Sequence, residues 1–179
     1  MKQDLNETLP VPAGITVEVS DNTVHIKGPK GEVSRRFVIP RVAVELKAGN
    51  IVLSAKRATK REKAKLYSTL AHLKNMIRGV QSPFVYILKV CSGHFPMNIS
   101  FANNKLAVKN FLGEKIPRVT VIPQGTALKI EADRITVSSC DPELAGRTAS
   151  NIEQLTRISL RDKRIFQDGI FITEKAGAI

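Results

Sequence analysis

The sequence is poor in cysteine and has no long hydrophobic run, and both shortages exclude classes of protein. Two cysteines among 179 residues are too few for a disulfide-stabilised scaffold. The longest strongly apolar stretch, Phe84 to Val90, contains Lys89 and is far too short to cross a bilayer. The first ten residues, MKQDLNETLP, lack the apolar core of a secretory signal. We therefore expect a soluble intracellular protein with no membrane partner.

Side chains in catalytic or metal-binding arrangements are also scarce. His25, His72 and His94 are far apart and have no Glu-x-x-His partner, so surface or packing roles are the better interpretation. Cys91 and Cys140 have no neighbouring His and no Cys-x-x-Cys frame. The segment 28–31, Gly-Pro-Lys-Gly, lacks the ending of a phosphate-binding loop and favours a tight turn. We predict no catalytic residues, no metal site, no cofactor and no enzymatic activity.

Positive charge, in contrast, is abundant. The chain has 28 Lys and Arg against 16 Asp and Glu, a net charge of +12, with 42% hydrophobic residues. That balance is typical of a folded protein, and the excess charge favours a polyanionic partner such as nucleic acid. The alternative is a basic protein that its charge merely keeps in solution.

An internal repeat is the most informative feature of the sequence. Residues 21–27 align with 103–109 at an offset of 82, and 51–54 align with 135–138 at an offset of 84. Between them the tetrapeptide Ile-Pro-Arg-Val occurs twice, at 39–42 and at 116–119. Matching segments in the same order predict a duplicated unit of about eighty residues.

Strands followed by one helix are predicted in each copy. In the first copy, hydrophobic residues alternate over 15–19 and 24–26 around a turn at Asp21-Asn22, and again over 42–46 and 51–53. A helical stripe follows, with a Thr59–Glu62 capping box at its start and an end at Gly79. The stripe consists of Leu66, Leu70, Leu73, Ile77 and Val80.

The second copy repeats this plan. Strands are predicted within 85–90, 106–108, 119–122, 128–130 and 135–137, and Asp141-Pro142-Glu143 is a strong helix start. The predicted fold class is therefore α+β, with two tandem homologous domains, each a small antiparallel sheet covered by one helix. The domains span residues 1–81 and 82–179, and the second ends in a basic tail.

Two clusters of basic residues could bind phosphate. Residues 56–65 hold six basic side chains and one acid at a helix start; this cluster is equally consistent with a solvated helix face. Arg157, Arg161, Lys163 and Arg164 precede Phe166 and a turn at Asp168-Gly169, an arrangement that can follow a phosphate backbone. The seven Phe residues fall mostly in apolar patterns and are expected in the core, so folded nucleic acid is favoured over single strands. RNA is favoured over DNA because the sequence has no pattern of a recognition helix or zinc finger for the major groove.

The amino-acid sequence of several segments resembles that of protein six of the large ribosomal subunit, in its archaeal and eukaryotic form. The clearest stretch looks like the C-terminal signature of that family, and the resemblance covers nearly the whole chain. It rests on Asn151-Ile152-Glu153-Gln154, Ile158, Arg161, Arg164, Phe166-Gln167-Asp168-Gly169-Ile170-Phe171 and Lys175, with His94-Phe95-Pro96-Met97, Ile39-Pro40-Arg41-Val42, Lys74-Asn75-Met76-Ile77 and Gly79-Val80.

The resemblance implies a structural, non-catalytic protein of the cytoplasmic ribosome that binds large-subunit ribosomal RNA, mainly through its second domain. It further implies a place near the stalk base and the sarcin–ricin loop, beside other ribosomal proteins, with no small-molecule substrate. The residues expected at the RNA are Arg157, Arg161, Lys163, Arg164, Gln167 and Lys175 near the C-terminus, and Lys109, Asn110, Lys115 and Arg118 on loops of the second sheet.

Three positions depart from the family pattern. Cys91 stands where an aromatic residue is usual, and Gly93 resembles an insertion, so the strand register there is an open question. Position 147 is Arg where a neutral polar residue is expected. The alternatives to a ribosomal role are a free RNA- or DNA-binding regulator and an enzyme whose site is not recognisable, but neither base-reading residues nor a catalytic constellation is visible.

Overall fold

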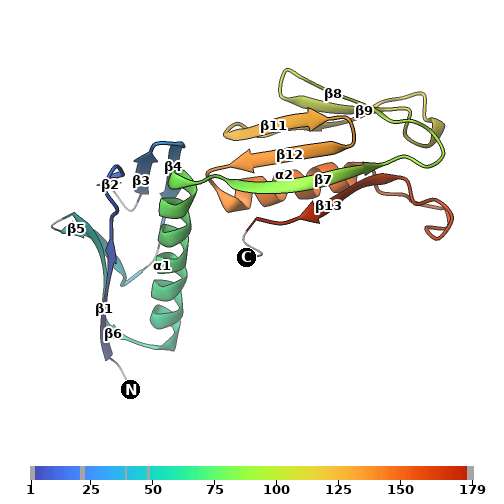
Figure 1. Ribbon diagram of the computed structural model, residues 1–179. Helices are drawn as coiled ribbons and strands as arrows, with labels where there is room; N and C mark the ends of the chain where they lie inside the picture. Colours follow the sequence, from blue (N-terminus) through green and yellow to red (C-terminus); the bar gives the residue numbers. More distant parts are fainter. Residues whose placement is uncertain (1–2, 21–22, 39, 48, 177–179) are drawn as a thin grey trace. The chain divides into compact units, whose positions relative to one another are not determined.

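The computed structural model describes residues 3–20, 23–38, 40–47 and 49–176, and the chain divides into two compact units, 1–83 and 84–179 (Figure 1). Each unit contains one long helix and antiparallel strands. This confirms the predicted α+β class with tandem sheet-plus-helix units. None of the helices in the described ranges is long and apolar enough to cross a membrane.

The first unit has two three-stranded antiparallel sheets rather than one. One sheet has the order β1-β6-β5 and the other the order β2-β3-β4. Helix α1 packs against β6 and β3, and a single hydrophobic core lies between these elements. The strands are β1 (Gln3–Pro10), β2 (Thr16–Ser20), β3 (Thr23–Gly28), β4 (Gly31–Arg36), β5 (Ala43–Lys47) and β6 (Asn50–Ala58).

Helix α1 (Lys60–Gln81) has the start that the sequence predicts. Thr59 is its N-cap, and the Thr59 backbone N–H donates to the Glu62 carboxylate at 2.9 Å, as part of a capping box. All five residues of the predicted stripe are buried. The predicted end at Gly79 is wrong. Gly79 is buried within the helix, which continues until the Ser82 N–H closes its last turn on the Arg78 carbonyl, immediately before Pro83.

The second unit has a four-stranded sheet of order β11-β12-β7-β13 and a three-stranded sheet of order β10-β9-β8. Helix α2 (Pro142–Leu155) packs against β7, β12 and β13, with the Asp141 side chain accepting from the Glu143 N–H at its start, as predicted. The strands are β7 (Phe84–Cys91), β8 (Asn98–Ala102), β9 (Lys105–Lys109), β10 (Arg118–Val121), β11 (Thr126–Glu131), β12 (Arg134–Ser139) and β13 (Gly169–Glu174).

The strand topology of the first unit recurs in the second, which supports a duplication. The order β1-β6-β5 corresponds to β7-β12-β11, and β2-β3-β4 corresponds to β8-β9-β10. The Ile-Pro-Arg-Val match is wrong as an alignment, because the second copy leads into β10 whereas the first stands between β4 and β5. Topology instead matches Pro40 with Pro123, which follows β10. Ile39 and the predicted turn at Asp21-Asn22 lie outside the described residues.

Strands β1, β4, β8 and β13 were not predicted from the sequence. Strand β13 matters most, because it is an edge strand that pairs with β7 and anchors the end of the basic loop 156–168 that precedes it. Strand β7 is continuous through Cys91, which stands opposite Gly169, and Gly93 lies beyond the strand. The departures at Cys91 and Gly93 therefore leave the pairing at the end of β7 regular, and the register shift between β7 and β13 lies elsewhere, between Ile172 and Glu174.

Candidate nucleic-acid interface

Three loops of the second unit contact one another at the end of the sheet where β7 ends and β13 begins (Figure 1). We call residues 91–97, 110–118 and 156–168 the loop cluster. Two of its segments have no counterpart in the first unit: the β3–β4 connection is a two-residue turn, whereas β9 and β10 are joined by eight residues that include a 3-10 helix, Phe111–Gly113. Residues 156–168, which lead into β13, are likewise an addition to the repeat.

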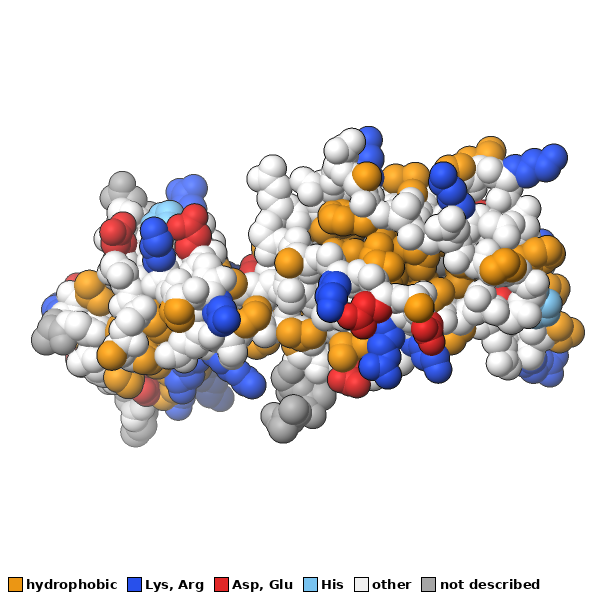
Figure 2. Space-filling view, turned by 45° about the horizontal axis from the view of Figure 1, so that its top comes forward, with side chains coloured by type: hydrophobic (Ala, Val, Ile, Leu, Met, Phe, Trp, Pro, Cys, Tyr) orange, Lys and Arg blue, Asp and Glu red, His pale blue; other side chains and the backbone are white. Residues whose placement is uncertain are grey.

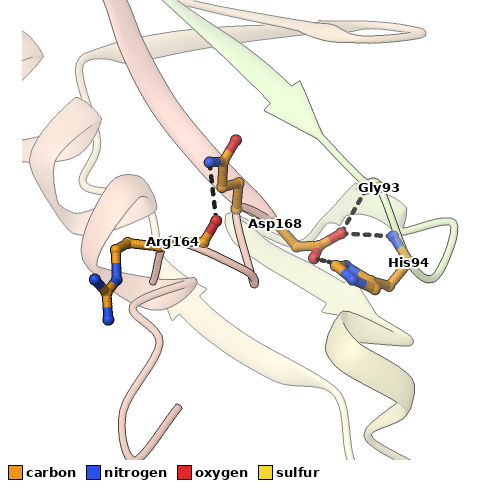
Figure 3. A network of polar contacts seen from close by, with 5 residues as sticks. Gly93, His94, Arg164 and Asp168 are labelled. Atoms are coloured by element: carbon orange, nitrogen blue, oxygen red, sulfur yellow. Dashed lines mark hydrogen bonds and ion pairs between the residues drawn. The ribbon is translucent and has the colours of Figure 1, made fainter. Parts of the chain in front are cut away.

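Asp168 joins two of these loops (Figure 3). Its side chain is only 2% exposed. Its Oδ1 accepts from the backbone N–H groups of Gly93 at 2.5 Å and His94 at 2.9 Å, and its Oδ2 lies 2.5 Å from His94 Nδ1. Burial alone would raise the pKa of Asp168, but the hydrogen bonds from His94 and Gly93 outweigh it and hold that pKa below its usual value. The carboxylate therefore remains ionised and holds the two loops together.

Further contacts bring in the third loop. The His94 ring lies 5.0 Å from the Phe166 ring, centroid to centroid. Asn110 Nδ2 donates to the Pro96 carbonyl at 3.1 Å, from a left-handed backbone conformation that Asn tolerates. All three loops are thus joined by side-chain contacts, which hold in place the backbone that carries their charged residues.

Arg118 is held by protein groups on several sides. Its Nε and Nη2 donate to the two oxygens of Glu114 at 2.8 and 2.6 Å, an arrangement that lowers the pKa of Glu114. Its Nη1 donates to the carbonyls of Leu155 and Arg157 at 2.9 and 3.2 Å, and its guanidinium lies 4.4 Å from the centroid of the Phe111 ring. Arg118 therefore fastens the end of α2 to β10.

The other predicted RNA-binding residues fall into two groups, according to whether their side chains contact other groups of the protein. Arg164 pairs with Asp162 at 3.0 Å, and Gln167 donates to the Arg164 carbonyl at 3.3 Å. Arg161 lies over the Phe166 ring at 5.0 Å. Side chains that form no hydrogen bond or ion pair with another described residue are those of Lys109, Lys115, Arg157, Lys163 and Lys175.

The structure brings most of these residues together, but not all. The residues of the loops 110–118 and 156–168 share the loop cluster, and Lys109 directly precedes it. Lys175 lies apart from the loop cluster. Strand β13 begins at the cluster with Gly169, and Lys175 follows its last residue, Glu174, at the far end. On the visible face of the second unit, Lys and Arg side chains lie around a central group of hydrophobic side chains (Figure 2).

The phenylalanines correct one expectation. Phe37, Phe84 and Phe111 are buried, but Phe95, Phe101 and Phe171 are exposed and Phe166 is half-buried. The prediction that most of them lie in the core is therefore wrong. The surface positions arise because Phe171 stands on the outward side of edge strand β13 and Phe95 on a loop. The sequence also gave no sign of the His94–Asp168 contact, since its partners are 74 residues apart.

Among the described residues, no three His, Cys, Asp or Glu side chains gather as a metal ion would require. Burial raises the pKa of the Cys140 thiol, which favours the unreactive protonated form. The segment 28–31 forms the predicted tight turn, with Gly28 paired to Gly31.

These features define a strongly basic, duplicated α+β protein with a rigid cationic loop cluster on its second half. The family model described as ribosomal protein L6 matches residues 11–82. A large ribosomal subunit protein uL6 from Nanoarchaeum equitans is 42% identical over 94% of this chain and 92% of its own length. One from Methanosarcina mazei is 40% identical over 98% of this chain and 100% of its own length. The chain belongs to the uL6 family of large-subunit ribosomal proteins.

Proposed function

We propose that this protein is a structural, non-catalytic component of the large subunit that binds large-subunit ribosomal RNA through the loop cluster. The observation that carries the proposal is the set of cations there whose side chains have no partner in the described protein: Lys115, Arg157 and Lys163. Cations without an ion-pair partner, held on rigid loops in a protein of net charge +12, are suited to neutralise closely spaced phosphates.

The mechanism is static positioning. Phosphate contacts fix the register of a protein on RNA, and they do so best when the cations have little freedom to lose on binding. The ionised Asp168 and its bonds to Gly93 and His94 supply part of this by fixing the backbone on which the cations stand. Arg161 lies over Phe166, a contact that leaves its guanidinium N–H groups available to phosphate oxygens.

Some predicted contacts take a positioning role in this proposal. Arg118 and Asn110 hold the loops, and Gln167 holds the Arg164 carbonyl, while their remaining polar groups contact RNA secondarily. Arg164 can exchange its exposed Asp162 partner for a phosphate, since a surface ion pair contributes little stability. Lys109 and Lys175 extend the basic surface on either side.

A place near the stalk base and the factor-binding region, next to other ribosomal proteins, completes the proposal. It follows from the family resemblance rather than from a contact in this chain. The proposal also divides the chain into two domains. Residues 1–81 form a first domain without the added loops, and residues 82–179 form the second domain, which binds the RNA.

The test replaces Arg161, Lys163 and Arg164 together by Glu in the full chain. We expect a folded protein that is lost from large subunits in sucrose-gradient sedimentation, because three cations become anions and the charge of the interface changes by six units. The matched control, Arg161→Lys with Lys163→Arg and Arg164→Lys, keeps the charge and should be incorporated. Normal incorporation of the folded Glu variant would contradict the assignment and would favour a free RNA- or DNA-binding regulator.

A further inference from the structure

A pocket with a volume of about 850 Å³ opens beside the loop cluster, between the end of α2, the loop 156–168 and strands β7 and β13. Its volume lies within the range of pockets that enclose small organic ligands. Aromatic rings, side-chain amides and cations line it together; among them are Gln154, Arg157, Lys163, Phe166, Gln167 and Phe171.

Phe171 gives this pocket a preformed aromatic surface. The side chain is 45% exposed although it stands in the middle of β13. Its ring lies against the backbone of Gly169, where an added Cβ would be only 3.2 Å from the ring Cζ and where φ is +152°. Only glycine combines that backbone conformation with room for the ring, so the sequence Gly169-Ile170-Phe171 builds the aromatic wall.

The pocket lining holds two cations and two carboxylates, which differ in whether protein groups already contact them. Both acidic residues of its lining are turned to protein partners: Glu153 Oε1 accepts from the Ile172 N–H at 3.0 Å, and Asp168 is held by Gly93 and His94. The Arg157 and Lys163 side chains have no hydrogen-bond or ion-pair partner among the residues that the structure describes. The lining therefore offers two cations without a protein partner, whereas its two carboxylates already accept hydrogen bonds from protein N–H groups.

We infer that this pocket holds one unstacked nucleotide of RNA, with the base against Phe171 and its phosphate between Arg157 and Lys163. The inference rests on the proposed function and adds to it a site for a base. An aromatic surface, amides that can bond to a base edge, and cations for phosphate are what single-stranded RNA recognition uses. A base stacked inside a double helix cannot reach Phe171, so the ligand is a base from a bulge, loop or end.

The test titrates the isotope-labelled full chain with a single-stranded pentanucleotide, r(AAAAA), and follows the side-chain amide signals of Gln154 and Gln167 by NMR. Both signals should shift, and Phe171→Ala should weaken pentanucleotide binding about tenfold, the usual scale for loss of one base–aromatic stack. Phe101→Ala is the matched control, because Phe101 is 38% exposed on β8 and does not line the pocket. It should bind like the unchanged protein.

Two further ligands show whether the bound nucleotide is an unpaired base of an RNA chain, a paired base or a free nucleotide. A ten-base-pair RNA duplex can contact the loop cluster through its phosphates and so shift the Gln167 signal, but it should leave the Gln154 signal unmoved. Free AMP should bind far more weakly than r(AAAAA), since the chain of the pentanucleotide supplies further phosphate contacts. Equal binding of AMP would overturn the assignment to RNA, and equal binding of r(AAAAA) to Phe171→Ala would overturn the stacking site. Phe171→Leu, which keeps an apolar side chain without a π face, should reproduce the loss if Phe171→Ala proves unstable.

This outcome is independent of the charge-reversal test. If the Phe171 variants bind RNA normally while the Arg161–Lys163–Arg164 variant still fails to enter subunits, the pocket inference is wrong and the proposed function stands. If the charge-reversed variant is incorporated normally, the proposed function itself fails.

Discussion

Asp168 is the residue on which the geometry of the loop cluster depends most. A carboxylate that accepts three hydrogen bonds while 2% exposed contributes far more than a surface aspartate. Asp168→Asn removes the charge but preserves the shape. We expect the free energy of unfolding to fall by about 1.5–3 kcal/mol at neutral pH, the usual scale for hydrogen bonds to charged groups. Urea titration measures it, with the exposed Asp133→Asn as control.

The same substitution predicts a pH dependence. Because the pKa of Asp168 is lowered in the folded state, its stabilisation is complete above the usual aspartate pKa of about 4 and is lost as the pH falls through the lowered value. The stability difference between the unchanged protein and Asp168→Asn should therefore shrink as the pH falls below 4. A difference that stays constant down to pH 2.5 would contradict an ionised Asp168.

Gly28 packs so closely against Val80 of helix α1 that there is no room for a side chain. A Cβ at this position would lie 2.8 Å from the Val80 Cβ and Cγ2 and 3.0 Å from the Val80 carbonyl oxygen. Since part of this obstacle is helix backbone, we expect Gly28→Ala to destabilise the fold by about 1–3 kcal/mol. Gly93→Ala is the control, because its Cβ would meet only Asp168 Oδ1 at 3.8 Å. Equal stabilities in thermal unfolding would show that the first unit relaxes around the added methyl group.

At the scale of elements, the end of α2 depends on a side chain from another strand. The last carbonyls of a helix have no partner within the helix, and Arg118 of β10 donates to the Leu155 and Arg157 carbonyls. Arg118→Lys cannot make these bonds and the paired bonds to Glu114 together. We expect a loss of about 1–2 kcal/mol in stability and faster hydrogen exchange of the Arg157 N–H, which donates to Gln154. Lys115→Gln should leave that exchange rate unchanged.

Elements specified by local chemistry could be predicted from the sequence, and elements specified by distant partners could not. The capping box at Thr59 and the Asp141-Pro142 start use residues within one turn of each helix. Strand β1, by contrast, is polar and exists through pairing with β6 some fifty residues away, and β13 exists through pairing with β7. The Ile-Pro-Arg-Val match misled because the duplicated copies differ in loop length between β3–β4 and β9–β10.

The candidate site shows the same division. Its cations could be predicted because charged residues can be read directly from a sequence. Which of these cations bind other protein groups, and which are available to RNA, could not be predicted. Arg118 and Arg164 are the same residue type in the sequence, but their surroundings differ. Arg118 donates to Glu114 and to two backbone carbonyls, whereas Arg164 pairs with the exposed Asp162. The pocket beside Phe171 was missed because it needs Gly169, α2 and the loop 156–168 in one place.

At the scale of the whole molecule, duplication supplied a scaffold and additions to the second copy supplied the site. Both units share two antiparallel sheets and one helix, but only the second has the eight-residue β9–β10 connection and the loop that leads into β13. Most of the proposed RNA-binding residues stand on these additions. The first unit, whose own cationic segment 56–65 begins α1, retains the plainer form of the fold.

The central claim is that the loop cluster is where this protein meets ribosomal RNA. The most direct measurement is ultraviolet crosslinking of purified large subunits, followed by mass spectrometry of the peptides joined to RNA. We predict crosslinks from residues 109–118 and 156–171, and their loss when subunits are dissociated before irradiation. Crosslinks confined to residues 56–65, or none from the second unit, would contradict the claim.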